Sequence, residues 1–311
     1  MSVDYTSVRL LARIRLKSGL PSATDPSTGA FTDSDLLGLI DDSVSSYLLP
    51  LIRRVNERYL VTSDTITIVS GTAGYRIPTR SVASTIKDVQ VLVGSRDVSL
   101  PRIEPILATN YSGGNWASTS SLGYSLNSNT ITLLPTPTAA GTMLIFYERR
   151  CNSLIAAANA VPITIIASNV YTFASQTYLG TSGTTSTDFI LAPPGFDIMA
   201  ASLSGTVTAT AFTPAAAVSG ISVGDYIALA GDSPVLNLPA ELYPLVESKT
   251  IVTVMEARRD PGLTNAQALL REQEKNAVVL IGKRTEGIPR LIVNRFGPGG
   301  ARGPYWPVRG Y

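Results

Sequence analysis

The side chains that could carry out covalent chemistry are few. Ser84 and Lys87 match the Ser-x-x-Lys pattern of penicillin-binding enzymes. That chemistry requires the serine at the start of a helix, with Ser-Asp-Asn and Lys-Thr-Gly elements opposite it. Here Ser84 opens a predicted strand, the sequence contains no Ser-Asp-Asn, and Lys249-Thr250 is followed by Ile251. We therefore attribute the match to chance.

The chain has no histidine and one cysteine, Cys151. Histidine is the commonest general base and metal ligand, so its absence removes Ser-His and Cys-His nucleophiles and most zinc sites. Without a base beside it, Cys151 is better explained as a small buried or loop thiol. We predict a protein that is not an enzyme, with no catalytic, metal-binding or cofactor-binding residues and no cofactor.

Two groups of carboxylates could in principle bind a cation or cleave a glycosidic bond. The aspartates within 33–42 are explained by helix capping and a solvated face. The glutamates within 241–256 lie on one predicted helix. Carboxylates on adjacent turns of one helix cannot flank a sugar from two sides. Neither group is predicted to be a site.

The composition points instead to association. Hydrophobic residues make up 44% of the 311 residues, which is enough for a core, but charged residues make up only 15%, against roughly 25% in ordinary soluble domains. Either small polar residues or neighbouring subunits must cover the surface, and the second possibility predicts an oligomer. The net charge of +2 is too small for a dedicated nucleic-acid binder. No uninterrupted apolar run reaches the roughly 20 residues of a membrane helix, so we expect a soluble chain without a membrane partner.

Helices are predicted near the start of the chain. Residues 3–17 suit a short amphipathic helix, with Val8, Leu11 and Ile14 on one face and a solvated basic face opposite. A longer helix over 32–60 follows.

The start of this longer helix is well defined in the sequence. Thr32 is a natural N-cap, and Asp35 completes a capping-box-like start. Pro50 lies inside the apolar stripe and should kink or divide the helix.

Helices return late in the chain as a predicted αα-hairpin. The first helix covers 240–259, and Asp260-Pro261-Gly262 breaks it. The second covers 264–283, with Thr264 as its N-cap and Gln267 in the capping-box position.

Between the helices the apolar period changes to two, which is typical of strands. Residues 62–150 predict a small antiparallel sheet. The stretch from Cys151 to Ala240 contains no lysine or arginine, and we interpret it as an inserted β-domain. The predicted fold class is α+β: a helical bundle core with a small antiparallel β-sheet and an inserted β-domain. The predicted domains are 1–61 plus 236–284 (helical core), 62–150 (β-sheet region), 151–235 (inserted β-domain) and 285–311 (extended C-terminal docking tail).

The C-terminal tail combines spaced arginines with aromatic residues among glycines. Such a segment cannot build its own core, while aromatic and arginine side chains are strong interface anchors. We predict that it docks on a partner protein, and single-stranded nucleic acid is the alternative ligand. The predicted partner-binding residues are Arg290, Arg295, Phe296, Arg302, Tyr305, Trp306, Arg309 and Tyr311.

Several phrases, in order, resemble the head-to-tail connector (adaptor, or head completion) proteins of tailed bacteriophages. The acidic-capped helix FTDSDLLGLIDDSVSSYLLPLI comes first, then the strand–Pro-x-Pro–strand NTITLLPTPTAAGTMLIFYERR. The most telling stretch is VGDYIALAGDSPVLNLPAELYPLVESKTIVTVMEARRD, with RTEGIPRLIVNR after it. The resemblance covers roughly 31–296. It departs at Cys151, where proline is common, and in the tail, whose glycines, arginines and aromatic residues are individual to this sequence.

The resemblance implies a virion protein of the phage neck, assembled in the host bacterial cytoplasm. It would form a ring, usually a dodecamer, that binds the portal protein, extends the DNA ejection channel and offers a platform for tail or nozzle proteins. Double-stranded DNA would pass through without sequence recognition. The alternative is a phage-associated peptidoglycan hydrolase or a β-rich host-surface binding protein.

Overall fold

The computed structural model describes residues 6–21, 31–93, 96–104, 106–107, 122–193 and 197–282. The described residues up to Ile281 belong to one compact unit. Strands dominate, with 35% of residues, and the described residues form four helices if α2, the π-helical turn after it and α3 are taken as one. A curled, seven-stranded antiparallel half-barrel sheet is its largest sheet. The prediction of a helical bundle core with only a small sheet is therefore wrong.

The physical reason is that the β regions build hydrophobic cores of their own. One buried cluster is made by strands between Ile68 and Tyr147, and another by residues between Val161 and Ile227. Serine and threonine occupy many outward positions of these strands. The alternation of apolar and polar residues along the strands therefore involves few charged residues, and the extent of the β-structure is easily underestimated from the sequence. The helices build a third cluster and do not enclose the others.

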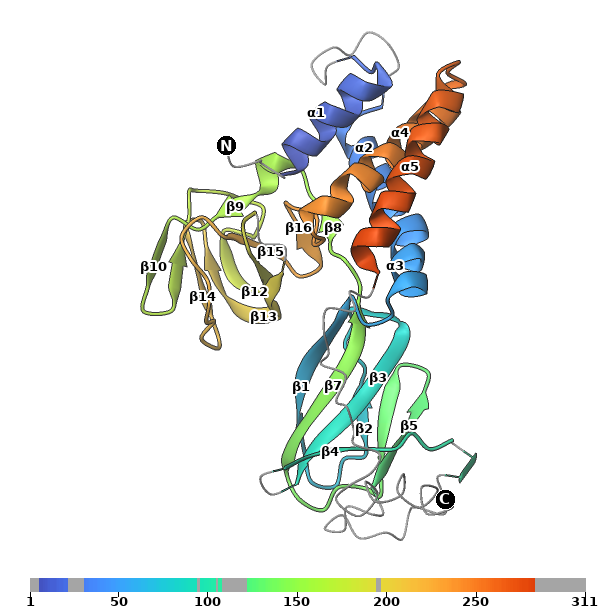
Figure 1. Cartoon of the computed structure of the whole chain (residues 1–311). Helices are drawn as coiled ribbons and strands as arrows, with labels where there is room; N and C mark the ends of the chain where they lie inside the picture. Colours follow the sequence, from blue (N-terminus) through green and yellow to red (C-terminus); the bar gives the residue numbers. More distant parts are fainter. Residues whose placement is uncertain are drawn as a thin grey trace, which may run out of the picture. The chain divides into compact units, whose positions relative to one another are not determined.

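The helices cluster together (Figure 1). Their bounds are α1 Ser7–Ser18, α2 Asp33–Ser43, the π-helical turn Val44–Leu48, α3 Leu49–Val55, α4 Tyr243–Arg258 and α5 Leu263–Ile281, with short 3₁₀ turns at Ala157–Asn159 and Ala240–Leu242. α4 contacts α1, α2 and α5, and α3 also contacts α5. α1 and α5 therefore lie on different sides of α4.

The predicted start of the second helix is confirmed. The Thr32 side chain accepts the Asp35 backbone N–H, and the Asp35 carboxylate accepts the Thr32 backbone N–H at 2.8 Å. The predicted interruption at Pro50 takes the form of the π-helical turn just before it. Proline has no N–H for the carbonyl four residues earlier and clashes with that carbonyl, and a locally widened turn relieves both problems.

The αα-hairpin forms, but its second helix begins earlier than predicted. α5 starts at Leu263, so Thr264 lies inside the helix and is not its N-cap. The Asp260 carboxylate accepts the Gly262 backbone N–H at 2.8 Å and shapes the turn. An aspartate three residues before the first helical residue thus shapes the entry to the helix, where the sequence pattern had placed a threonine cap.

The region after α3 is a two-layer β-structure. Its strands are β1 Val61–Ile68, β2 Gly74–Arg76, β3 Ser81–Val93, β4 Arg96–Ser99, β5 Gly123–Asn127, β6 Thr130–Leu134 and β7 Gly141–Arg149. One sheet has the order β1-β7-β3-β4 and the other β2-β6-β5. Val89 and Ile145 of the first sheet belong to the same buried cluster as Ile131 and Leu133 of the second. The two sheets therefore pack face to face.

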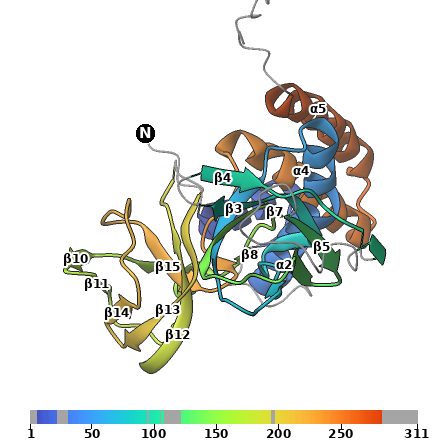
Figure 2. The same ribbon diagram turned by 90° about the horizontal axis from the view of Figure 1, so that it is seen from below.

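The seven-stranded sheet has the order β10-β11-β14-β13-β12-β15-β9. Its strands are β9 Val161–Pro162, β10 Ile165–Ala167, β11 Val170–Thr172, β12 Ser182–Ile190, β13 Ile198–Thr208, β14 Ala211–Pro214 and β15 Tyr226–Leu229. Phe189 and Phe212 are fully buried, and Tyr171 meets Phe189 edge to face at 4.7 Å. A Cβ at Gly205 would lie 2.4 Å from the Phe212 ring, so only glycine fits there. Figure 2 shows these strands together from a second direction.

The chain enters and leaves the seven-stranded sheet through a narrow neck. β8 Ser153–Leu154 leads in, β16 Asp232–Ser233 leads out, and the two pair in parallel. Leu154 and Leu236, on either side of the insertion, both pack in the helical core. The neck therefore joins the sheet to the helices at one place.

Candidate interaction surfaces

Asp188 of β12 forms a fully buried polar link between the two β regions. Its carboxylate accepts hydrogen bonds from the guanidinium of Arg80, the residue just before β3, and from the Asn152 side chain. The backbone N–H groups of Ser202 and Gly231 donate to it at 2.7 and 2.8 Å. A buried carboxylate requires this many donors. Since residues 151–240 contain no lysine or arginine, the cation has to come from outside the sheet.

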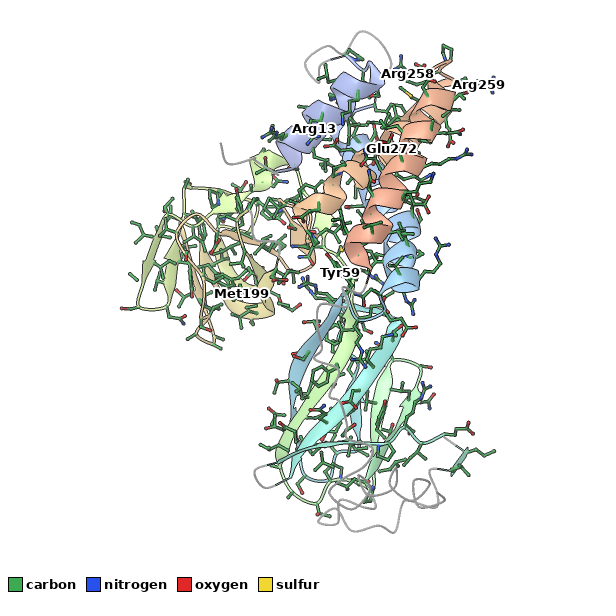
Figure 3. All side chains as sticks on the ribbon, viewed as in Figure 1. Arg13, Tyr59, Met199, Arg258, Arg259 and Glu272 are labelled. Carbon is green, nitrogen blue, oxygen red and sulfur yellow. The ribbon has the colours of Figure 1, made fainter. Side chains whose placement is uncertain are left out.

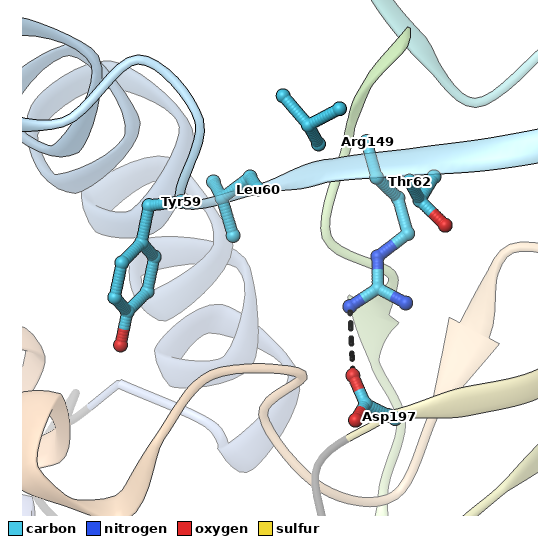
Figure 4. Close-up of a pocket in the computed structure, with 6 residues that line it drawn as sticks. Tyr59, Leu60, Thr62, Arg149 and Asp197 are labelled. Carbon is cyan, nitrogen blue, oxygen red and sulfur yellow. Dashed lines mark ion pairs between the residues drawn. The ribbon is translucent and has the colours of Figure 1, made fainter. Parts of the chain in front are cut away.

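A second link between the two β regions, more exposed than the first, lines a pocket of about 290 Å³ (Figure 4). Arg149 at the end of β7 points at Asp197, with 3.8 Å between Nη2 and Oδ1. Tyr59, Leu60, Val61 and Thr62 complete the wall. Partial burial and the nearby Glu241 carboxylate raise the pKa of Tyr59 above its ordinary value. Arg149 and Asp197 neutralise each other, so the pocket offers no net charge to an ionic ligand.

The chemical candidates of the sequence have structural roles. Ser84 lies within β3, a strand, where the helical Ser-x-x-Lys geometry is not available, and Lys87 makes an ion pair with Glu57. Burial raises the pKa of Cys151 to about 11, so its thiol stays protonated at neutral pH. Among the described residues, no group of three acids or cysteines could hold a metal ion.

The predicted docking residues all lie outside the described part of the chain. These are Arg290, Arg295, Phe296, Arg302, Tyr305, Trp306, Arg309 and Tyr311. Their role stays a prediction. The interaction surfaces that the structure does describe are on the helices, and the sequence did not show which faces of these helices stay exposed.

The first of these surfaces is the outward face of α5. Only Ala277 and Ile281 of its 19 residues are buried. On the outward face, exposed residues follow one another at three- and four-residue steps, and Glu272 is the one charged residue among them. We call this set the α5 stripe. Val279 is 78% exposed, and Leu269 and Leu280 are close to half exposed. The α5 stripe consists of Asn265, Leu269, Glu272, Asn276, Val279 and Leu280.

The second surface is the outward face of α1. Val8, Ala12 and Leu16 follow one another at four-residue steps, and Leu16 is 82% exposed. We call these three residues with the exposed Arg9 the α1 stripe. The predicted burial of Val8 is wrong: α1 packs through Leu10, Leu11 and Ile14 instead. Leu11 and Ile14 are buried as predicted, and Leu10 takes the place of Val8 on the buried face.

The rest of the basic face of α1 is not simply solvated, as the sequence suggested. Arg13 and Lys17 both make ion pairs with Glu247 of α4, at 2.9 and 2.8 Å, and Glu247 itself is buried. Arg9 is left without an ion pair within the described residues, and so is Glu272 (labelled in Figure 3). One free cation therefore lies on the α1 stripe and one free anion on the α5 stripe.

Comparisons with known proteins assign no family. No protein-family model matches the chain, and a search of curated proteins finds no significant relative. Within the described residues, no helix is long and apolar enough to cross a membrane.

Proposed function

We propose that the chain is a structural adaptor of a bacteriophage head-to-tail junction. Copies of it form a ring that binds the portal protein, extends the DNA channel and carries the tail attachment platform. The observation that supports this most is the exposure of α5, a long helix of the hairpin whose outward face bears Leu269, Val279 and Leu280. Apolar patches of this kind mark protein–protein contacts.

The described architecture is consistent with a passive, load-bearing role. The buried ion pair between Arg80 and Asp188 joins its two β regions. Because both partners are hydrogen-bonded, this pair resists displacement of one region against the other. The near-neutral composition suits a channel, because a strongly basic wall would hold the DNA backbone. Each tail segment on a closed ring needs only modest affinity for the portal, since identical contacts act together.

Electron microscopy of the purified chain, alone and mixed with portal rings, tests the proposal. We expect closed rings of one order, attached to the portal. Replacing Tyr305 and Trp306 with alanine should leave the rings intact and weaken portal attachment at least tenfold. A chain that stays monomeric at high concentration and does not bind portals would contradict the proposal.

A host-surface binding protein is the second candidate, and one observation favours it. The outward faces of β12, β13 and β14 present hydroxyl groups opposite one another, as at Thr184 and Thr206, Ser186 and Ser204, and Thr206 and Thr213. An uncharged row of hydroxyls suits hydrogen bonding to carbohydrate. Binding of host-cell polysaccharide by the full chain, lost when Thr184 and Thr206 are replaced by valine, would support this function.

A further inference from the structure

The two exposed stripes of the helices differ in chemistry and in place. The α1 stripe carries a cation, Arg9, and the α5 stripe carries an anion, Glu272. Both helices pack on α4, and α4 separates them, so one subunit cannot bring its own stripes together (Figure 1). Each stripe therefore needs a partner from outside the subunit.

We infer that the α1 stripe of one copy packs against the α5 stripe of the next copy, with Arg9 facing Glu272. This inference rests on the proposed ring and adds its interface. Two different patches in contact make a heterologous interface, which closes into a ring when the rotation between copies is right. A pair of stripes on one subunit is the minimum that such a ring requires.

Charge decides against the simplest alternative, a contact between two copies of α1. The helix contains Arg9, Arg13, Arg15 and Lys17 and no acid, so two copies side by side would repel each other. Arg13, Arg15 and Lys17 are already bound to Glu247 or Asp33. Arg9 is free to meet an anion of another copy, and Glu272 is an exposed anion without an ion-pair partner among the described residues.

The directions of the helices set the register of this contact. α1 and α5 run in opposite directions within one subunit (Figure 1). A ring whose axis follows the helices keeps them antiparallel between copies. With Arg9 opposite Glu272, Ala12 then lies near Leu269 and Leu16 lies near Asn265. The α1 stripe, about 12 Å long at 1.5 Å per residue, covers the N-terminal part of the α5 stripe.

Disulfide cross-linking of the full chain tests this arrangement. We expect Leu16→Cys with Asn265→Cys, and separately Ala12→Cys with Leu269→Cys, to give a ladder of oligomers up to the ring order on a non-reducing gel. Each single-cysteine variant should give no ladder beyond a dimer. Background from Cys151 is low, because burial raises the pKa of its thiol to about 11.

Charge exchange supplies an independent readout, measured as the ring fraction by mass photometry. Arg9→Glu and Glu272→Arg should each weaken assembly at least tenfold, and the double variant should restore it. Arg271→Glu is the matched control, because Arg271 is exposed on α5 but outside the α5 stripe; it should change assembly less than threefold.

The outcomes separate the interface from the ring. Rings that form normally in both charge variants, with no cross-linked ladder, would overturn the α1–α5 contact and leave the adaptor proposal standing. A wild-type chain that forms no ring would overturn both. A ladder together with rescue by the double variant would establish the interface.

Discussion

α4 and α5 are adjacent helices of one hairpin, yet they use their apolar residues in opposite ways. α4 buries nine of its 16 residues, and α5 buries two of its 19. α4 has neighbours on several sides, whereas α5 has α4 and α3 on one side. The comparison teaches that an apolar residue in this hairpin stabilises the subunit if it lies on α4, and is available for assembly if it lies on the outer face of α5.

The largest expected effect comes from shortening one leucine on each helix. Leu245 of α4 is buried in the helical core, and Leu269 of α5 is 43% exposed. Leu245→Ala should lower the free energy of unfolding by about 2–5 kcal/mol, because it leaves a cavity. Leu269→Ala should change it by less than about 0.5 kcal/mol while weakening ring formation.

Urea denaturation and mass photometry on both variants provide the measurement. Equal losses of stability in the two variants would contradict the difference in role between α4 and the outer face of α5. Circular dichroism checks that each variant keeps its helices.

The next effect comes from replacing one glutamate on each helix. Glu247 is buried and binds Arg13 and Lys17, whereas Glu274 is partly exposed and lies 3.8 Å from Arg54. Glu247→Gln should cost about 1–3 kcal/mol, since a buried acceptor loses charge-assisted hydrogen bonds. Glu274→Gln should cost at most about 1 kcal/mol, and salt should reduce that cost. Chemical denaturation at low and high salt distinguishes the two, and the comparison fails if Glu274→Gln costs more.

The smallest effect comes from a carboxylate of α2 that faces the neck. Asp41 of α2 accepts the Leu154 backbone N–H at 3.0 Å, and burial raises its pKa to about 6, with Asp42 and Asp232 adding repulsion. The folded chain therefore holds this proton more tightly than the unfolded chain, so stability falls as pH rises from about 4 to about 6.

Asp41→Asn should remove this loss. After allowance for solvent screening, we expect a gain of about 1 kcal/mol at pH 7.5 and none at pH 4. Urea unfolding at the two pH values measures it, with Asp64→Asn, an exposed carboxylate on β1, as the control. If Asp41→Asn changes the free energy of unfolding equally at both pH values, burial at the neck does not raise the pKa of Asp41.

Local sequence rules predicted local structure well. The capping box at Thr32 and Asp35 and the interruption at Pro50 depend on neighbouring residues only, so they could be identified in the sequence. The αα-hairpin followed from its apolar spacing and its Asp-Pro-Gly break. The start of α5 was missed, because the turn before it is formed by the Asp260 side chain and not by Thr264.

Contacts between distant segments were not predictable from the same rules. α5 has apolar residues on two faces, Ala277 and Ile281 on one and Leu269 and Val279 on the other. Spacing alone does not say which face α4 covers. The Arg80–Asp188 link was missed for a similar reason, although an acid-containing stretch without lysine or arginine signalled that its partners must come from elsewhere.

The parallel pairing of β8 and β16 limits how the chain can be shortened. Two antiparallel strands can be joined by a two-residue turn, but parallel neighbours need a crossover of a dozen residues or more. In this chain the whole seven-stranded sheet serves as the crossover between β8 and β16. A guest fold could be grafted in its place if its termini reach Leu154 and Asp232 and if a neutral residue replaces Arg80. Simple excision would leave the neck with no way to close.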